Sequence, residues 1–176
     1  DMMNDPAVCG NPNPNEADPR SEVPSASFDD IWSGSDFPYV CLKDRGRTEA
    51  LIDCMTRIVR PGDTVVDIGS GSGVLALAAA RAGAGRVLAV EIDALMVAAL
   101  RRTVAANGFE AIIEVVQTDA RKLRDIHADV LAAEIIDTGL LDEPFVPVMN
   151  ALTESRIVDK STRMLFGGYT TTVQLV

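Results

Sequence analysis

Several protein classes need features that this 176-residue sequence has little of. Its three cysteines, Cys9, Cys41 and Cys54, are widely spaced and form no C-x-x-C pair. They therefore indicate neither a structural zinc site nor a disulfide framework. The single histidine, His127, lies among charged residues that are typical of a surface. No run of about 18 apolar residues is present, so we expect no transmembrane helix.

The start of the sequence also lacks the basic and then apolar stretches of a secretory signal peptide. We therefore expect a cytoplasmic location, which in a eukaryote would extend to the nucleus. The first residue is not methionine, which suggests a trimmed piece of a longer chain.

Basic residues are outnumbered, with 16 Lys and Arg against 26 Asp and Glu and a net charge of −10. An acidic surface repels phosphate backbones, which argues against a nucleic-acid partner. It would attract a cationic substrate such as an arginine-rich segment. The same charge could equally serve only to keep the protein soluble. The apolar share of 47% is enough for a globular domain with a core.

Composition divides the chain into three parts. Residues 1–27 are rich in Pro, Asn, Ser and acids and predict an extended or disordered arm. Residues 28–60 gather aromatic side chains and then a helix at 46–59, which together predict a segment that docks over a ligand. Residues 61–176 form the predicted core, which Pro61-Gly62 separates from the helix.

Within the core, strands alternate with helices. We predict strands at 64–67, 86–91, 112–116 and 129–135, with helices at 74–82 and 93–106. This order favours an α/β fold with a mainly parallel, twisted sheet and helices on both faces. Two more strands, within 156–158 and 171–175, predict an antiparallel C-terminal end. Ligands bind such sheets beyond the carboxyl ends of the strands.

A glycine-rich loop, residues 67–73, follows the first strand and precedes a helix. Such a turn lets a ligand approach the backbone closely. Dinucleotide-binding enzymes use G-x-G-x-x-G or A at this place, but here the third position is Val74. The glycines alone therefore leave the identity of a nucleotide-like ligand open.

Acidic residues at the ends of three strands narrow the choice. Asp67 would repel a pyrophosphate and attract an ammonium group. Glu91, at the end of the next strand, is placed to accept hydrogen bonds from ribose hydroxyls. Asp119, followed by Ala120, could accept one from an adenine amino group, although it could also be an ordinary turn residue. A ligand with an amino group, a ribose and an adenine but no phosphate fits these acids, and S-adenosylmethionine is such a ligand.

Residues 65–93 resemble the first two motifs of class I S-adenosylmethionine-dependent methyltransferases. The resemblance implies a Rossmann-like fold and S-adenosylmethionine as cofactor. Residues 42–48 resemble the helix motif of protein arginine methyltransferases, in which an arginine, here Arg47, reaches the cofactor's carboxylate. The further cofactor-binding residues that it implies are Gly69, Ser70, Gly71, Gly73, Ile92 and Glu134.

Residues 134–143 resemble the double-E loop of protein arginine methyltransferases and look most like the monomethylating branch, through Asp137-Thr138 and the leucines. The resemblance implies that Glu134 and Glu143 are catalytic and grip the guanidinium of an arginine in a protein or peptide. As alternatives, Glu134 could be a solvated acid at a strand end and Glu143 an ordinary loop acid.

The likeness to arginine methyltransferases covers residues 40–176 and has gaps. Residues 37–41 replace the family's His-Glu-Glu-Met-like segment, and its C-terminal β-barrel and Thr-His-Trp loop are missing. A homodimer is expected if such a barrel exists. Two other functions stay open: a methyltransferase for a small molecule or a ribosomal protein, and a catalytically silent regulatory homologue.

Overall fold

The computed structural model describes residues 37–136 and 143–168, together with residues 170 and 172. The predicted arm at 1–27 lies outside the described residues. So do Phe28, Ile31 and Trp32 of the docking segment, and Asp137-Thr138 of the loop that resembles the double-E loop.

Five parallel strands form one sheet in the order β3-β2-β1-β4-β5. All four strands predicted in the core before residue 136 are present, and a fifth follows. The sequence order reverses between β1 and β4, which is where a parallel α/β sheet binds its ligand. The strands are β1 (Thr64–Ile68), β2 (Arg86–Glu91), β3 (Ile113–Gln117), β4 (Val130–Ala133) and β5 (Arg163–Met164).

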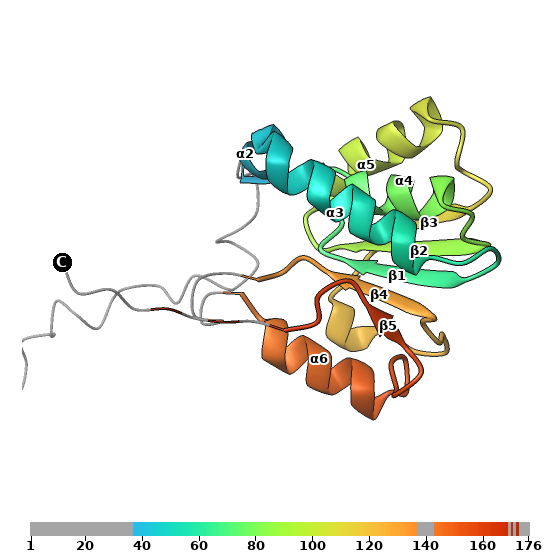
Figure 1. The fold of residues 1–176 in the computed structure, drawn as a ribbon, viewed down its shortest axis with the longest axis vertical. Helices are drawn as coiled ribbons and strands as arrows, with labels where there is room; N and C mark the ends of the chain where they lie inside the picture. The colour runs from blue at the N-terminus through green and yellow to red at the C-terminus, as the bar shows by residue number, and fades with distance from the viewer. Residues whose placement is uncertain (1–36, 137–142, 169, 171, 173–176) are drawn as a thin grey trace, which may run out of the picture.

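Helices cover both faces of this sheet, as predicted (Figure 1). One face carries α3 (Arg45–Ile58), α4 (Val74–Arg81) and α5 (Ala94–Ala106), and the other carries α6 (Phe145–Glu154). Each face has its own cluster of buried apolar side chains, so the sheet lies between two cores. A short helix, α2 (Phe37–Lys43), precedes α3, and the 3-10 turn η1 (Ala120–Lys122) follows β3.

Two acidic caps fix helices that border the site. Asp93 begins α5, as predicted, and its carboxylate accepts hydrogen bonds from the backbone N–H groups of Leu95 and Met96. Asp44 caps α3 by accepting from the backbone N–H of Arg47 at 3.0 Å. Such a cap stabilises a helix by about 1 kcal/mol, and here it also sets where the first turn of α3 presents Arg47.

The prediction of the first C-terminal strand was wrong. Residues 156–158 form no strand: Arg156 has a φ of 57°, and the backbone N–H of Ile157 returns to the carbonyl of Leu152 at 2.9 Å. Ile157 and Val158 are buried because they close the end of α6, a helix that the sequence reading missed. The next strand, β5, pairs parallel with β4, and the second predicted strand at 171–175 lies largely outside the described residues.

Candidate active site

The glycine loop leaves β1 at the switch point and is held against β2. The backbone N–H groups of Gly69 and Ser70 both donate to the carbonyl of Val90 at 3.0 Å. Gly69 has a φ of 71°, and a Cβ there would meet Ile135 Cγ2 at 2.6 Å. A side chain at Gly69 would therefore push away the segment that follows β4 and carries Glu134.

Gly73 has a packing role besides the cofactor contact predicted for it. It caps α4 with a φ of 83°, and a Cβ there would meet Leu100 Cδ1 of α5 at 2.4 Å. It does not line the cavity beside the loop. Gly73 therefore lets α4 and α5 pack closely, and its contact with the cofactor stays a prediction.

A cavity of about 470 Å³ opens beyond the carboxyl ends of the central strands, a size typical of sites for small ligands. Residues brought from α3, from the glycine loop and from the ends of β2, β3 and β4 meet on its wall. Apart from Gly73, every residue predicted to bind the cofactor lies there: Arg47, Asp67, Gly69, Ser70, Gly71, Glu91, Ile92, Asp119, Ala120 and Glu134.

Asp67 is fully buried on this wall. Neither of its carboxylate oxygens accepts a hydrogen bond from the residues that the structure describes. Burial raises the pKa of Asp67 to about 7, and the negative charges of Glu134 and Glu91 add to the shift. A buried carboxylate without a donor is unfavourable, so a cationic amino group of a ligand would satisfy it.

Glu91 holds the backbone of the site, besides the predicted acceptance of hydrogen bonds from ribose hydroxyls. Its Oε2 accepts from the backbone N–H of Gly71 at 2.9 Å, and its Oε1 accepts from those of Ile92 at 2.7 Å and Asp93 at 3.0 Å. The carboxylate thus ties the glycine loop to the start of α5. Since a carboxylate has about four acceptor positions, one remains on Oε2 for a ligand hydroxyl.

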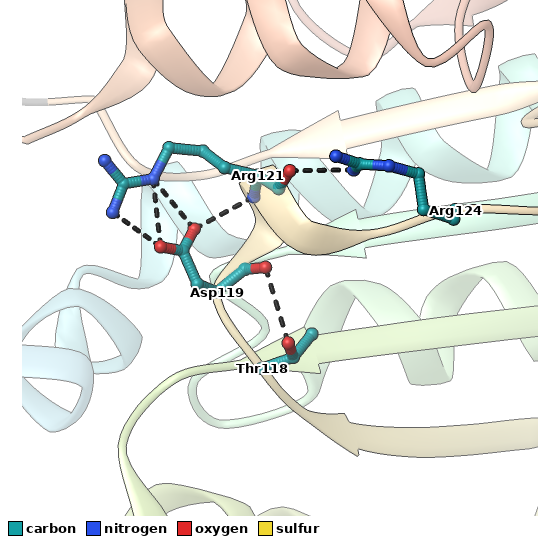
Figure 2. Close-up of polar contacts among 4 residues, drawn as sticks. All are labelled: Thr118, Asp119, Arg121 and Arg124. Carbon is teal, nitrogen blue, oxygen red and sulfur yellow. Dashed lines mark hydrogen bonds and ion pairs between the residues drawn. The ribbon is translucent and has the colours of Figure 1, made fainter.

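Asp119 opens the turn after β3 and is held by Arg121, a residue that the sequence reading overlooked (Figure 2). Its Oδ1 accepts from the backbone N–H of Arg121 at 2.9 Å and from Nε at 3.0 Å. Its Oδ2 accepts from Arg121 Nη2 at 2.5 Å and from the same Nε at 2.9 Å. The Arg121 guanidinium holds the pKa of this carboxyl below its usual range, so Asp119 is an anion.

Arg47 and Glu134 form an ion pair across the cavity wall. Arg47 comes from the first turn of α3, whereas Glu134 follows β4, where its backbone N–H donates to the carbonyl of Ile68 at 3.0 Å. The hydrogen bond to Glu134 raises the pKa of Arg47. The pair shows that the Glu134 carboxylate is placed to accept from a guanidinium.

A second cavity of about 380 Å³ adjoins this ion pair. Glu143, which lies two residues before the start of α6, lines both cavities together with Glu134. Arg47, Cys41 and Leu51 are also common to the two walls. The two predicted catalytic acids therefore lie where the large cavity meets the smaller one. Within the part of the chain that the structure describes, no cluster of His, Cys, Asp and Glu could hold a metal ion, and no helix is long and apolar enough to cross a membrane.

Comparison with known proteins places this site in a family. The profile of the ribosomal protein L11 methyltransferase (PrmA) family matches residues 45–156, more than half of the chain. The chain belongs to this family. It is therefore a class I methyltransferase domain with S-adenosylmethionine as its cofactor, as the glycine loop and its acids predicted. The unpartnered Asp67 and the acceptor left on Glu91 fit that cofactor's amino group and ribose.

Two of the curated relatives have names that state different methyl acceptors, and the name of a third states none. An arginine N(omega)-methyltransferase from Streptomyces achromogenes is 42% identical over 62% of this chain and 32% of its own length. An uncharacterized protein from Methanocaldococcus jannaschii is 34% identical over 78% of this chain and 53% of its own. A ribosomal protein L11 methyltransferase from Pelotomaculum thermopropionicum is 46% identical over 47% of this chain and 27% of its own. The chain spans about half or less of each.

Solved arginine methyltransferases share the fold. Protein arginine methyltransferase 10 from Arabidopsis thaliana is 33% identical, with a TM-score of 0.61 over 70% of this chain and 36% of its own. The enzyme–prozyme PRMT1 complex from Trypanosoma brucei, solved with AdoHcy, is 27% identical, with a TM-score of 0.63 over 70% of this chain and 39% of its own. Both likenesses confirm the predicted Rossmann-like methyltransferase fold.

Proposed function

We propose that this domain transfers a methyl group from S-adenosylmethionine to the guanidinium of an arginine in a protein or peptide. Glu134 and Glu143 hold the guanidinium. The observation that carries this proposal is the shared position of the two acids on both cavities, between the cofactor cavity and the smaller one beside it. The net charge of −10 favours the approach of a cationic substrate.

Four residues of the large cavity would hold the cofactor. Asp67 would accept from its amino group, Glu91 from its ribose hydroxyls and Asp119 from its adenine amino group. Arg47 would bind its carboxylate, which requires the guanidinium of Arg47 to turn partly away from Glu134. The bound cofactor supplies an electrophilic methyl group on a sulfonium.

A guanidinium is a weak nucleophile because its charge is delocalised, and its very high pKa keeps it protonated at neutral pH. Its planar donors match carboxylates in pairs. Two carboxylates fix its plane and draw the positive charge towards the nitrogens that they hold, so the remaining nitrogen gains electron density. Catalysis of this kind is mainly positioning and electrostatic stabilisation.

The existing Arg47–Glu134 ion pair supports this role for Glu134. When the cofactor's carboxylate engages Arg47, the acceptor positions of Glu134 that Arg47 holds become available to a substrate guanidinium. The relative named arginine N(omega)-methyltransferase and the solved arginine methyltransferases are consistent with such an acceptor.

The test uses S-adenosylmethionine with a labelled methyl group and three acceptors: an arginine-rich peptide, the same peptide with lysine at each arginine, and free L-arginine. We expect label on the arginine peptide and none on the lysine peptide. Label on free arginine alone would favour a small-molecule acceptor. Protein that binds S-adenosylhomocysteine but labels no arginine acceptor contradicts the proposal.

A ribosomal protein is the second candidate acceptor, favoured by the family profile and by the L11 methyltransferase from Pelotomaculum thermopropionicum. Methylation of a ribosomal protein at a residue other than arginine would support it. A catalytically silent homologue is the third candidate, and for it no acceptor would be labelled. These outcomes separate because only the first depends on Glu134 and Glu143 as a guanidinium grip.

A further inference from the structure

The part of the large cavity beyond β3 contains an arginine that no cofactor motif of the sequence assigned. Arg121 lies on the cavity wall two residues after Asp119, and Figure 2 shows its side chain folded back onto that carboxylate. The Arg121 side chain is half exposed, at 49%, whereas that of Asp119 is only 15% exposed. The acid is thus enclosed while the cation that holds it borders solvent.

The contacts between the two residues leave a defined vacancy for a hydrogen-bond donor. The Arg121 fork shares its Nε–H between the two oxygens, at 3.0 Å from Oδ1 and 2.9 Å from Oδ2, and its Nη2 donates to Oδ2 at 2.5 Å. The backbone N–H of Arg121 takes a second position on Oδ1, at 2.9 Å. Three N–H groups of Arg121 thus meet a carboxylate that has about four acceptor positions, so about one position remains for a ligand.

We propose that Arg121 is a positioning residue for adenine recognition: its fork fixes the plane of the Asp119 carboxylate so that this carboxylate offers its remaining acceptor position to the adenine amino group. This inference rests on the proposed place of the adenine at Asp119. A forked arginine–carboxylate contact fixes orientation as well as charge, which a single-point cation does not.

Positioning by Arg121 has a consequence for specificity. S-inosyl-L-homocysteine is the product analogue in which a carbonyl oxygen replaces the adenine amino group. A fixed carboxylate rejects this oxygen, because two acceptors then face each other without a proton. Without the fork, only the backbone N–H of residue 121 holds the Asp119 carboxylate, so its plane is less fixed, it binds the amino group less well and it repels the carbonyl less.

The experiment measures, by calorimetry, how tightly the protein binds S-adenosylhomocysteine and S-inosyl-L-homocysteine. For Arg121→Ala we expect adenosyl binding to weaken about tenfold and the ratio of the two affinities to fall at least about fivefold. Arg121→Lys keeps the charge but not the fork, so its ratio should lie nearer to that of Arg121→Ala than to that of the wild type. Thermal unfolding without ligand confirms that each variant is folded.

Lys122→Ala is the matched control, because Lys122 is an exposed cation of the same turn that does not line the cavity. We expect both affinities to stay within about twofold of the wild type. An unchanged ratio in Arg121→Ala overturns the inference, even if both ligands bind more weakly. Tighter adenosyl binding also overturns it, since Arg121 would then compete with the adenine.

Asp119→Asn separates this inference from the placement on which it rests. If Asp119→Asn lowers the ratio and Arg121→Ala does not, Arg121 has no positioning role, although the adenine does lie at Asp119. If neither variant changes the ratio, the adenine does not lie at Asp119. In both cases the methyl-transfer proposal is judged separately, by the acceptor assay.

Discussion

Asp119 and Asp67 line the same cavity, from the ends of β3 and β1, but their surroundings differ. Asp119 is clasped by Arg121, and its pKa lies below its usual range. Asp67 is fully buried without a donor among the described residues, and its pKa is raised to about 7. The chain thus orients one acid in advance and leaves the other for the ligand to complete. Glu134 is closer to the first kind, because Arg47 pairs with it.

The largest effect is expected at Glu134, whose charge grips the substrate in our proposal. Glu134→Gln should lower kcat about 1,000-fold, because an amide cannot hold and polarise a guanidinium as a carboxylate does. Binding of S-adenosylhomocysteine should change by less than about threefold. Rate assays and calorimetry check both values, and Glu114→Gln, on the exposed edge of β3, is the control. A collapse of cofactor binding would mean that Glu134 serves the cofactor instead.

Asp67→Asn tests the acid without a partner. The variant should bind S-adenosylhomocysteine about 100-fold more weakly, since the ligand's ammonium loses its counter-charge. At pH 8 the free protein should become more stable, because burying the ionised Asp67 is unfavourable by on the order of 4 kcal/mol for a pKa raised from 3.8 to about 7. Equal affinity in the two proteins would refute the role of Asp67.

Gly73→Ala separates residues that hold the ligand from residues that hold the loop. A Cβ would meet Leu100 at 2.4 Å in a backbone with a φ of 83°. Overpacking of this kind destabilises a protein by about 1–3 kcal/mol. Chemical denaturation should show this loss, while the folded variant should bind the cofactor product nearly as well as the wild type. A large loss of affinity at unchanged stability would instead support the predicted ligand role of Gly73.

A smaller effect is expected when the pH is changed, because the affinity for the cofactor product depends on the charge of Asp67. Below pH 7 Asp67 is protonated in the free protein and must lose its proton to bind an ammonium group, so affinity for S-adenosylhomocysteine should rise about tenfold from pH 6 to pH 8. The contribution of Asp67 to the stability of the folded protein has the opposite dependence on pH. It is fully present below pH 4 and is lost as pH rises through 7. Ligand binding at pH 6 should release the proton of Asp67 to the buffer, whereas at pH 8.5 Asp67 has no proton to release. Calorimetry in buffers of different ionisation enthalpy should therefore show a binding heat that depends on the buffer at pH 6 but not at pH 8.5.

Local patterns in the sequence were enough to predict much of the fold. The alternation of strands and helices predicted the sheet, and the acids at the strand ends predicted its ligand edge, because these patterns depend on neighbours in the chain. Two features depended on distant contacts: Gly73 packs on Leu100, and Ile157 closes α6. The helix α6 did carry a signal that was missed, apolar residues at 145, 148 and 152.

The sequence predicted which residues form the candidate site, but not which of these residues contact one another. A sequence places Asp67, Asp119 and Glu134 at one edge of a sheet, since strand ends lie together. It does not show that Arg47, brought by α3, pairs with Glu134, because that contact spans two elements far apart in the chain. The contact of Arg121 with Asp119 did have a signal in the sequence, because a cation that follows a turn acid by two residues can fold back onto it. The prediction for Asp119 did not include this neighbour.

The proposal stands or falls on which atom receives the methyl group. The most direct measurement incubates the protein with S-adenosylmethionine and a peptide that contains both arginine and lysine, and locates the added 14 Da by fragmentation mass spectrometry. We predict methylation on a terminal nitrogen of arginine, lost in Glu134→Gln. A methyl group on lysine or on the peptide's amino terminus, with arginine unchanged, would contradict it.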